Sequence, residues 1–301
     1  MSPAVTVADP GRAARAPGGR WRAYLALTKP RIIELLLITT VPAMMVAAGG
    51  WPGTGLLLVT LAGGTLSAGG ANAINNVVDR DIDALMRRTR HRPLPARRVG
   101  PAEALAVGLV LGAGGFVVLW LGANLVSALF ATGALGFYVL VYTLLLKRAT
   151  SQNIVIGGAA GAIPVVVGWT AVTGTPDLGA WVMFGIVFAW TPAHFWALAV
   201  RFRKDYEAAG VPMLPVVATH AETGVQITLY AALTAVFSLM LQPLTGLGIP
   251  YLVTAVVAGV WFVGESIRLL RHPERAMLLF RYSNVYLTVV FSAMAVDVLV
   301  A

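Results

Sequence analysis

The sequence contains no cysteine and few charged residues. Of its 301 residues none is Cys, and Asp, Glu, Lys and Arg together make up only 12%. Without cysteine there can be no disulfide framework, no thiolate metal site and no C-x-x-C-H attachment for a covalent haem. The scarcity of charge, together with a hydrophobic share of 58% and a mean hydropathy of +0.78, excludes an ordinary soluble domain.

Long apolar runs fill most of the chain. A bilayer-spanning helix needs about 20 mostly apolar residues. Nine stretches are suitable, at residues 27–48, 54–77, 102–121, 123–146, 153–173, 179–200, 223–242, 247–267 and 283–300. A transmembrane barrel would instead show short segments of alternating residues. The sequence therefore predicts an all-α, polytopic membrane protein with nine transmembrane helices in one bundle, formed by residues 24–301.

Basic residues lie on one side of these spans only. All 22 Lys and Arg residues fall around the start of the first span or in the connections that follow the second, fourth, sixth and eighth spans. The positive-inside rule then predicts a cytoplasmic N-terminus and an outside C-terminus. The net charge of +9 arises from these segments. It does not indicate nucleic-acid binding, which requires a basic patch on a soluble surface.

The first 23 residues differ from the rest of the chain. Residues 1–23 are rich in Ala, Gly, Pro and Arg and lack the apolar core of a secretory signal. We predict a disordered cytoplasmic tail. An organellar transit peptide is the alternative, although Pro and Gly disfavour the amphipathic helix that it requires.

Three of the 13 acidic residues lie within five positions, at Asp79, Asp81 and Asp83. Asn72, Asn76, Asp79 and Asp83 are spaced to share one face of a helix near its cytoplasmic end. Asp81 points the other way, and we interpret it as a solvated charge among arginines. Oxygen ligands from Asp and Asn suit Mg²⁺, which prefers carboxylates together with substrate phosphates. We predict that Asp79, Asp83 and Asn76 bind Mg²⁺ and, through it, a diphosphate.

An arginine-rich loop follows this motif and includes Arg88 and Arg92. Guanidinium groups suit bidentate contacts with phosphate. A basic loop alone would most simply bind anionic lipid. Next to the Asn/Asp face we favour phosphate binding, because ionisable groups in membrane segments are costly and usually functional.

A second polar cluster closes the predicted span 179–200. His194, Arg201 and Asp205 are spaced to share a helix face. For His194, hydrogen bonding within the bundle, ligation of a haem iron and proton handling all stay open. Arg201, Lys204 and Asp205 either anchor the helix at the membrane interface or face the diphosphate, and we favour the second interpretation.

Residues 72–95 resemble the N-x-x-x-D-x-x-x-D signature of UbiA-type intramembrane prenyltransferases. The motif Asp79-Arg-Asp-Ile-Asp83, followed by Arg88-Thr-x-x-Arg92-Pro-Leu-Pro, is similar to the sequences of the branch that farnesylates haem. Residues 28–31, 142–161 and 205–217 agree with the same branch, so the resemblance covers essentially the whole chain after residue 24. The quinone-prenylating branches carry another aspartate-rich repeat where this chain has the second polar cluster, so a second carboxylate-held metal is not expected.

The resemblance implies transfer of the farnesyl group of farnesyl diphosphate to a vinyl group of haem b, with addition of water, giving haem O and diphosphate. Mg²⁺ is the implied cofactor, and haem b is a substrate that must be held noncovalently. Taken with the two polar clusters, the catalytic residues we expect are Asn76, Asp79, Asp83 and His194. The diphosphate-binding residues we expect are Arg88, Arg92, Lys147, Arg201, Lys204 and Asp205.

The same resemblance, with a composition rich in Arg, Ala and Val, implies a location in a bacterial plasma membrane, with the active site near its cytoplasmic face. The implied partners are membrane lipid and a haem A synthase or terminal oxidase assembly proteins, and nucleic acid is not among them. Three other functions stay open. They are prenylation of an aromatic quinone precursor, transport with a cation site, and noncatalytic delivery of haem to oxidase subunits. A transporter would place its charges near the bilayer midplane, whereas these acids cluster at the end of a span.

Overall fold

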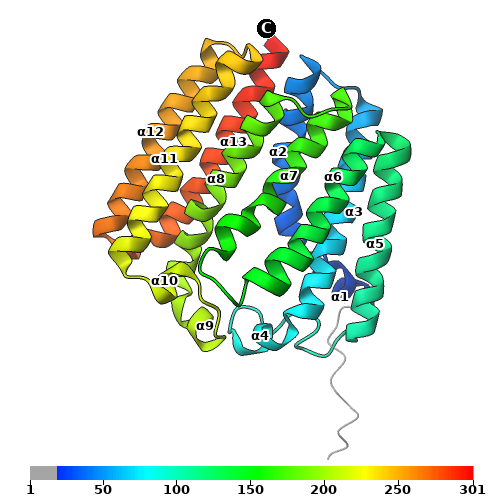
Figure 1. Cartoon of the computed structure of the whole chain (residues 1–301), viewed down its shortest axis with the longest axis vertical. Coiled ribbons are helices and arrows are strands. Elements are labelled where there is room, and N and C mark those ends of the chain that lie inside the picture. The colour runs from blue at the N-terminus through cyan, green and yellow to red at the C-terminus, as the bar shows by residue number, and fades with distance from the viewer. Residues whose placement is uncertain (1–18, 301) are drawn as a thin grey trace, which may run out of the picture.

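The computed structural model describes residues 19–300, and within this range the side chains of residues 31–37 are not described. The described chain is built from helices and turns (Figure 1). The helices are α1 Arg20–Leu27, α2 Pro30–Ala48, α3 Thr54–Val78, α4 Arg80–Leu85, α5 Pro101–Gly122, α6 Leu125–Gly136, η1 Phe137–Leu146, α7 Asn153–Thr173, α8 Leu178–Arg201, α9 Arg203–Ala208, α10 Leu214–Val217, α11 His220–Thr245, α12 Ile249–Arg271, η2 Pro273–Arg275 and α13 Ala276–Val300.

The all-α membrane bundle is confirmed. Within the described residues, eight helical segments are long and apolar enough to cross a membrane, with α6 and η1 counted as one. The remaining predicted span, 27–48, is represented by α2, of which residues 38–48 form the apolar stretch with described side chains. The count of nine spans and the orientation of the termini therefore stay predictions.

Glycines let α3 and α5 pack closely enough to bring their backbones into contact. A Cβ added to Gly70 would lie 2.7 Å from the carbonyl oxygen of Gly108 and from the amide nitrogen of Gly112. A Cβ on Gly115 would lie 2.7 Å from the amide nitrogen of Ser67. Small residues at this spacing are the usual means of close helix approach in membranes. The packing fixes the long helix α3, whose end carries the Asn/Asp motif.

The short helices gather at one end of the bundle. Figure 1 shows α1, α4, α9 and α10 together at the end opposite the C-terminus. Three of these helices carry basic residues of the predicted cytoplasmic segments, which are Arg20, Arg22, Arg80, Arg203 and Lys204. The two polar clusters found in the sequence therefore lie at the same end of the bundle.

Two expectations need correction. Residues 1–18 of the predicted tail, 1–23, lie outside the described residues. Residues 20–23 of the predicted tail are helical and belong to α1. Arg20 and Tyr24 both donate to the carboxylate of Glu103, and this contact holds α1 against α5.

The predicted span 123–146 is not one α-helix. It is α6 followed by the π-helix η1, in which the amide of Lys147 donates to the carbonyl of Tyr142, five residues earlier, at 2.8 Å.

Candidate active site

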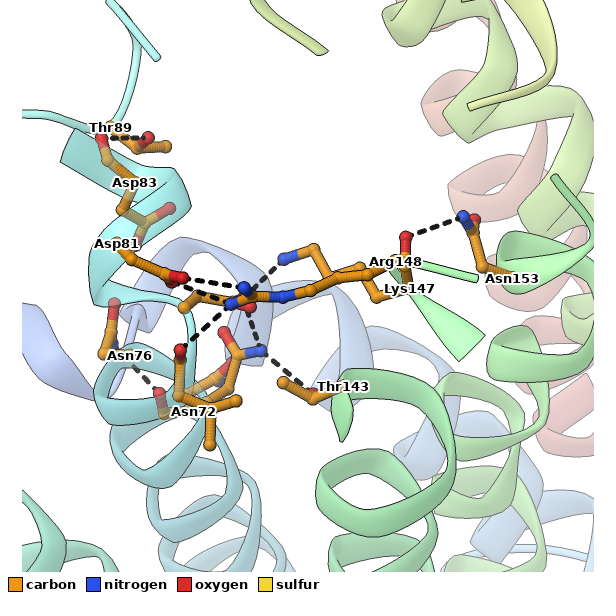
Figure 2. A network of polar contacts seen from close by, with 12 residues as sticks. Asn72, Asn76, Asp81, Asp83, Thr89, Thr143, Lys147, Arg148 and Asn153 are labelled. Atoms are coloured by element: carbon orange, nitrogen blue, oxygen red, sulfur yellow. Dashed lines mark hydrogen bonds and ion pairs between the residues drawn. The ribbon is translucent and has the colours of Figure 1, made fainter. Parts of the chain in front are cut away.

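Asp79 lies where α3 ends, and its side chain is fully buried. Its Oδ2 accepts from the Lys147 ammonium, and from the Asn75 amide at 2.8 Å. Its Oδ1 is buried and has no hydrogen-bond partner among the described residues. Figure 2 shows Lys147 and Arg148 reaching from the end of η1 toward the end of α3. Asp79 and Lys147, which we predicted to share a site, are therefore in direct contact.

Asn75 and Lys29 are site residues that the sequence analysis missed. The Asn75 amide also donates to Thr143 Oγ1 at 3.0 Å, and its Oδ1 accepts from the Lys29 ammonium at 2.6 Å. Lys29 adopts a left-handed backbone (φ 53°) immediately before Pro30, the first residue of α2. A signal for Asn75 was present, since residues 75, 79 and 83 are each four apart and share a helix face.

The amide nitrogens of Asn72 and Asn76 bind α1. Asn72 Nδ2 donates to the carbonyl of Thr28 at 3.0 Å, and Asn76 Nδ2 donates to the carbonyl of Leu27 at 2.9 Å. These carbonyls lie at the end of α1, so the contacts tie α1 to α3. Asn75 is the asparagine whose amide contacts Asp79, whereas Asn76 Oδ1 is buried without a partner among the described residues, and its assignment to Mg²⁺ stays a prediction.

Asp83 lies one turn beyond Asp79, on α4, and is 2% exposed. Arg92 Nη1 donates to its Oδ1 at 2.9 Å and to its Oδ2 at 2.8 Å. Thr89 Oγ1 donates to the Asp83 carbonyl at 2.9 Å and holds the loop back against α4. The second carboxylate therefore forms an ion pair with Arg92 of the arginine-rich loop.

Asp81 faces away from this pair, as predicted. Its exposed carboxylate accepts two hydrogen bonds of 2.7 Å from Arg148, which also donates to the carbonyl of Val78 (Figure 2). These hydrogen bonds from Arg148 lower the pKa of Asp81 to about 2, although partial burial opposes the shift. Asp81 is therefore a paired surface charge.

The arginine loop also contacts α9. Arg88 Nη2 donates to Tyr206 Oη at 3.0 Å, and Arg87 Nε lies 3.4 Å from Asp205 Oδ1. Asp205 is buried and pairs with this loop, whereas Arg201 and Lys204 are exposed. For these two, the assignment to the diphosphate stays a prediction.

His194 is held on α8 against α13. Its Nδ1 lies 2.6 Å from Ser283 Oγ, and its ring stacks between Trp190 and Phe280 at centroid distances of 4.1 and 4.4 Å. The hydrogen bond predicted as one of its roles is therefore present. No hydrogen bond of Nε2 is found within residues 19–300.

The carboxylates fit Mg²⁺ better than a metal held by protein alone. Among the described residues no group of three or more His, Cys, Asp or Glu side chains could enclose an ion. Mg²⁺ is commonly held by one or two carboxylates together with substrate phosphates. Asp79 and Asp83 supply such a pair, and the unpartnered Oδ1 of Asp79 is an acceptor without a donor.

A model of the family described as "UbiA prenyltransferase family" matches residues 36–288. The chain is 54% identical over 282 residues to the protoheme IX farnesyltransferase of Thermus thermophilus, with 93% of this chain covered but only 46% of that relative. The chain thus spans about half the length of that relative. It is 55% identical to protoheme IX farnesyltransferase 1 of Saccharopolyspora erythraea, covering 91% of this chain and 89% of the relative.

Solved structures share the fold. One concerns digeranylgeranylglyceryl phosphate synthase in membranes, with a TM-score of 0.78, 18% identity, and coverage of 94% of this chain and 99% of that one. A UbiA homologue from Archaeoglobus fulgidus bound to GPP and Mg²⁺ has a TM-score of 0.65 and 16% identity, covering 91% of this chain and 99% of that one. At these identities the likeness concerns the fold.

Proposed function

Because the chain belongs to the UbiA prenyltransferase family, we propose that it transfers the farnesyl group of farnesyl diphosphate to a vinyl group of haem b. The names of the relatives that are more than 50% identical to it support haem as the acceptor. The observation that carries the proposal is the buried pair of carboxylates, Asp79 and Asp83, each held by a cation at the end of an apolar bundle.

Asp79 and Asp83 would hold Mg²⁺, with Asn75 orienting Asp79. Mg²⁺ would neutralise charge on the leaving diphosphate, as it does in other sites of this chemistry. The binding of GPP and Mg²⁺ by a structural neighbour supports this cofactor. Asp79 Oδ1 offers an acceptor that no described residue occupies.

The cations beside these carboxylates would bind the diphosphate itself. Lys147 and Arg92 contact Asp79 and Asp83 directly, and Lys29 reaches Asn75. Arg88 lies on the loop between them and α9. Preorganised cations stabilise the negative charge that grows on a leaving group, so these residues would favour breakage of the bond between the diphosphate oxygen and C1 of the farnesyl group.

The remaining chemistry takes place on the two substrates. The allylic cation left by departure of diphosphate is attacked by the terminal carbon of the vinyl group, and a carbon–carbon bond forms. The positive charge then lies on the carbon next to the porphyrin ring, where water adds and loses a proton. Water must be excluded until this stage. The bundle interior, lined by side chains such as Val165, Val166 and Ile186, supplies an apolar environment.

His194 would contact the haem. Its Nδ1 is engaged by Ser283, which fixes the ring and leaves Nε2 for the haem iron or for proton transfer. Spectra of bound haem b distinguish these roles. Loss of an iron ligand in His194→Ala would shift the Soret band, whereas a proton-handling role would lower turnover and leave the spectrum unchanged.

We further propose a place in a bacterial plasma membrane, with the site near the cytoplasmic face. The gathering of the basic connections at the end of the bundle that carries the site supports this orientation (Figure 1). A haem A synthase or the assembly proteins of a terminal oxidase would receive the product.

The test is a reaction of purified protein in detergent with haem b, farnesyl diphosphate and Mg²⁺, followed by mass analysis of extracted haem. We expect haem to gain a farnesyl group and water, and we expect chelation of Mg²⁺ or Asp83→Asn to abolish this product. Prenylation of an aromatic acid with haem unchanged would instead identify a quinone-precursor enzyme. If folded protein modifies neither acceptor, the proposal is wrong.

A further inference from the structure

We propose that Tyr206 is a positioning residue for diphosphate binding, and that it acts by fixing the guanidinium of Arg88. The inference rests on the proposed function in one respect, the assignment of Arg88 to the diphosphate. It gives the second polar segment of the sequence a role that requires no second metal.

The geometry around Arg88 is that of a guanidinium held on several sides. Its Nη2 donates to Tyr206 Oη at 3.0 Å, and its central carbon lies 5.4 Å from the ring centroid of Phe202 and 5.8 Å from that of Tyr206. Aromatic faces at such distances attract a cation. Because the guanidinium is planar and its five donors have fixed directions, fixing one nitrogen and the plane also directs the others.

One of those other donors lacks a partner. Arg88 Nε is buried, and no hydrogen bond to it is found among the described residues. A buried donor without an acceptor costs free energy comparable to a lost hydrogen bond. An anionic oxygen of a diphosphate would satisfy Nε, and a charge-assisted hydrogen bond of that kind is stronger than a neutral one.

Tyr206 is built to hold this position. Its side chain is one of the largest in the buried core, and the residue is 2% exposed. Burial raises the pKa of its hydroxyl, although Arg88 and Arg92 oppose the shift, so the phenol is neutral and can accept from Arg88. The neighbouring contact between Arg87 and Asp205 joins the same two segments a second time.

The consequence concerns which residues of α9 affect binding. Lys204 is exposed, whereas Tyr206 acts through the half-buried Arg88, whose Nε is buried and without a partner among the described residues. The second polar segment therefore contributes mainly by orienting an arginine of the first.

The experiment compares wild type, Tyr206→Phe, Arg88→Ala and the double variant. Tyr206→Phe keeps the ring and removes only the hydroxyl. We expect kcat/KM for farnesyl diphosphate to fall about fivefold, the effect of one hydrogen bond, with the KM for haem b unchanged. Added to Arg88→Ala, Tyr206→Phe should have no further effect, because the two residues act as one unit.

Tyr251→Phe is the matched control. Tyr251 is also fully buried, and its hydroxyl donates to the carbonyl of Ser238 at 2.7 Å, on α11. We expect this variant to lose stability but to keep the kinetic constants of wild type. A fall in kcat/KM for farnesyl diphosphate in Tyr251→Phe equal to that in Tyr206→Phe would show that the effect is only structural, and would overturn the proposal.

Calorimetry of inorganic diphosphate binding in the presence of Mg²⁺ tests the contact between Arg88 and diphosphate without turnover. We expect Tyr206→Phe to weaken this binding about fivefold. Equal affinity in wild type and Tyr206→Phe, or an undiminished effect of Tyr206→Phe in the Arg88→Ala background, refutes the positioning role. If wild type binds diphosphate but does not farnesylate haem, the proposed function fails while the role of Tyr206 is still decided by the binding data.

Discussion

Loss of the ion pair between Lys147 and Asp79 should have a large effect on stability. The Asp79 side chain has no exposed surface, and that of Lys147 is 12% exposed. Without the ammonium, the carboxylate keeps only the amide of Asn75 as a side-chain partner among the described residues. Removing one member of a buried ion pair costs about 3–5 kcal/mol, because a buried charge is left uncompensated. We expect Lys147→Met to lower the free energy of unfolding by this amount.

A double variant separates stability from catalysis. Asp79→Asn removes the charge and nearly preserves the shape of the side chain. Replacing both members of a buried pair by uncharged groups is often close to neutral. We therefore expect Lys147→Met with Asp79→Asn to recover most of the lost stability. Product formation should stay lost, because both charges serve the diphosphate site.

The assay is unfolding of the three proteins in the same detergent, with mass analysis of extracted haem for activity. A loss below about 1 kcal/mol in Lys147→Met, typical of an exposed pair, would show that Asp79 is not a buried charge held by Lys147. A double variant as unstable as the single one would lead to the same conclusion. Recovery of activity in the double variant would remove the pair from the catalytic site.

Three further predictions concern neighbouring residues. Asn75→Ala should lower kcat/KM for farnesyl diphosphate at least about tenfold, because it removes hydrogen bonds to the charged groups of Asp79 and Lys29. Asn76→Ala should mainly lower thermal stability, since the Asn76 amide binds the end of α1. Asp81→Asn should preserve product formation and lower the free energy of unfolding by less than about 1 kcal/mol at pH 7. Because the pKa of Asp81 is lowered to about 2, its pairing with Arg148 stabilises the fold above the ordinary carboxyl pKa, and this stabilisation is lost as the pH falls toward 2. Unfolding of both proteins at a series of pH values checks this prediction. Arg201→Ala and Lys204→Ala should each raise the KM for farnesyl diphosphate measurably but by less than about threefold, because exposed charges act through screening solvent. An unchanged KM in both variants would exclude both residues from the site.

The membrane spans could be predicted from the sequence because hydropathy alone decides them. The predicted span 153–173 coincides with α7, and the predicted span 179–200 is extended by only one residue at each end in α8. Backbone groups in a bilayer must be satisfied within the segment, so a long apolar run has almost no alternative to a helix. The π-helix η1 could not be predicted in this way, because its composition is as apolar as that of its neighbours.

The choice between Asn75 and Asn76 shows where local periodicity stops being informative. Both residues lie within one helical turn of Asp79, and both spacings place an amide near its face. The difference is made by α1, whose last carbonyls, at Leu27 and Thr28, accept from Asn76 and Asn72. That contact joins segments more than 40 residues apart in sequence, and nothing in the motif itself reports it.

Lys29 was missed for a similar reason. In the sequence it counts as one more basic residue at the end of a span, where topology explains it. The left-handed turn before Pro30 carries its ammonium to Asn75 instead. A lysine directly before a helix-starting proline is a signal of a constrained turn, but the direction of its side chain depends on how α1 and α2 pack against α3.

The contacts among these residues also indicate how the site accepts its ligand. In the structure each carboxylate already has a cation, Lys147 on Asp79 and Arg92 on Asp83. A diphosphate would offer both cations a second set of oxygens, and bidentate or charge-assisted contacts with phosphate are strong enough to compete with those to a carboxylate. Turning toward the diphosphate, Lys147 and Arg92 would leave carboxylate oxygens for a divalent cation that arrives with it. We therefore propose that the buried ion pairs are the resting state of a site that exchanges partners when a diphosphate and a divalent cation bind.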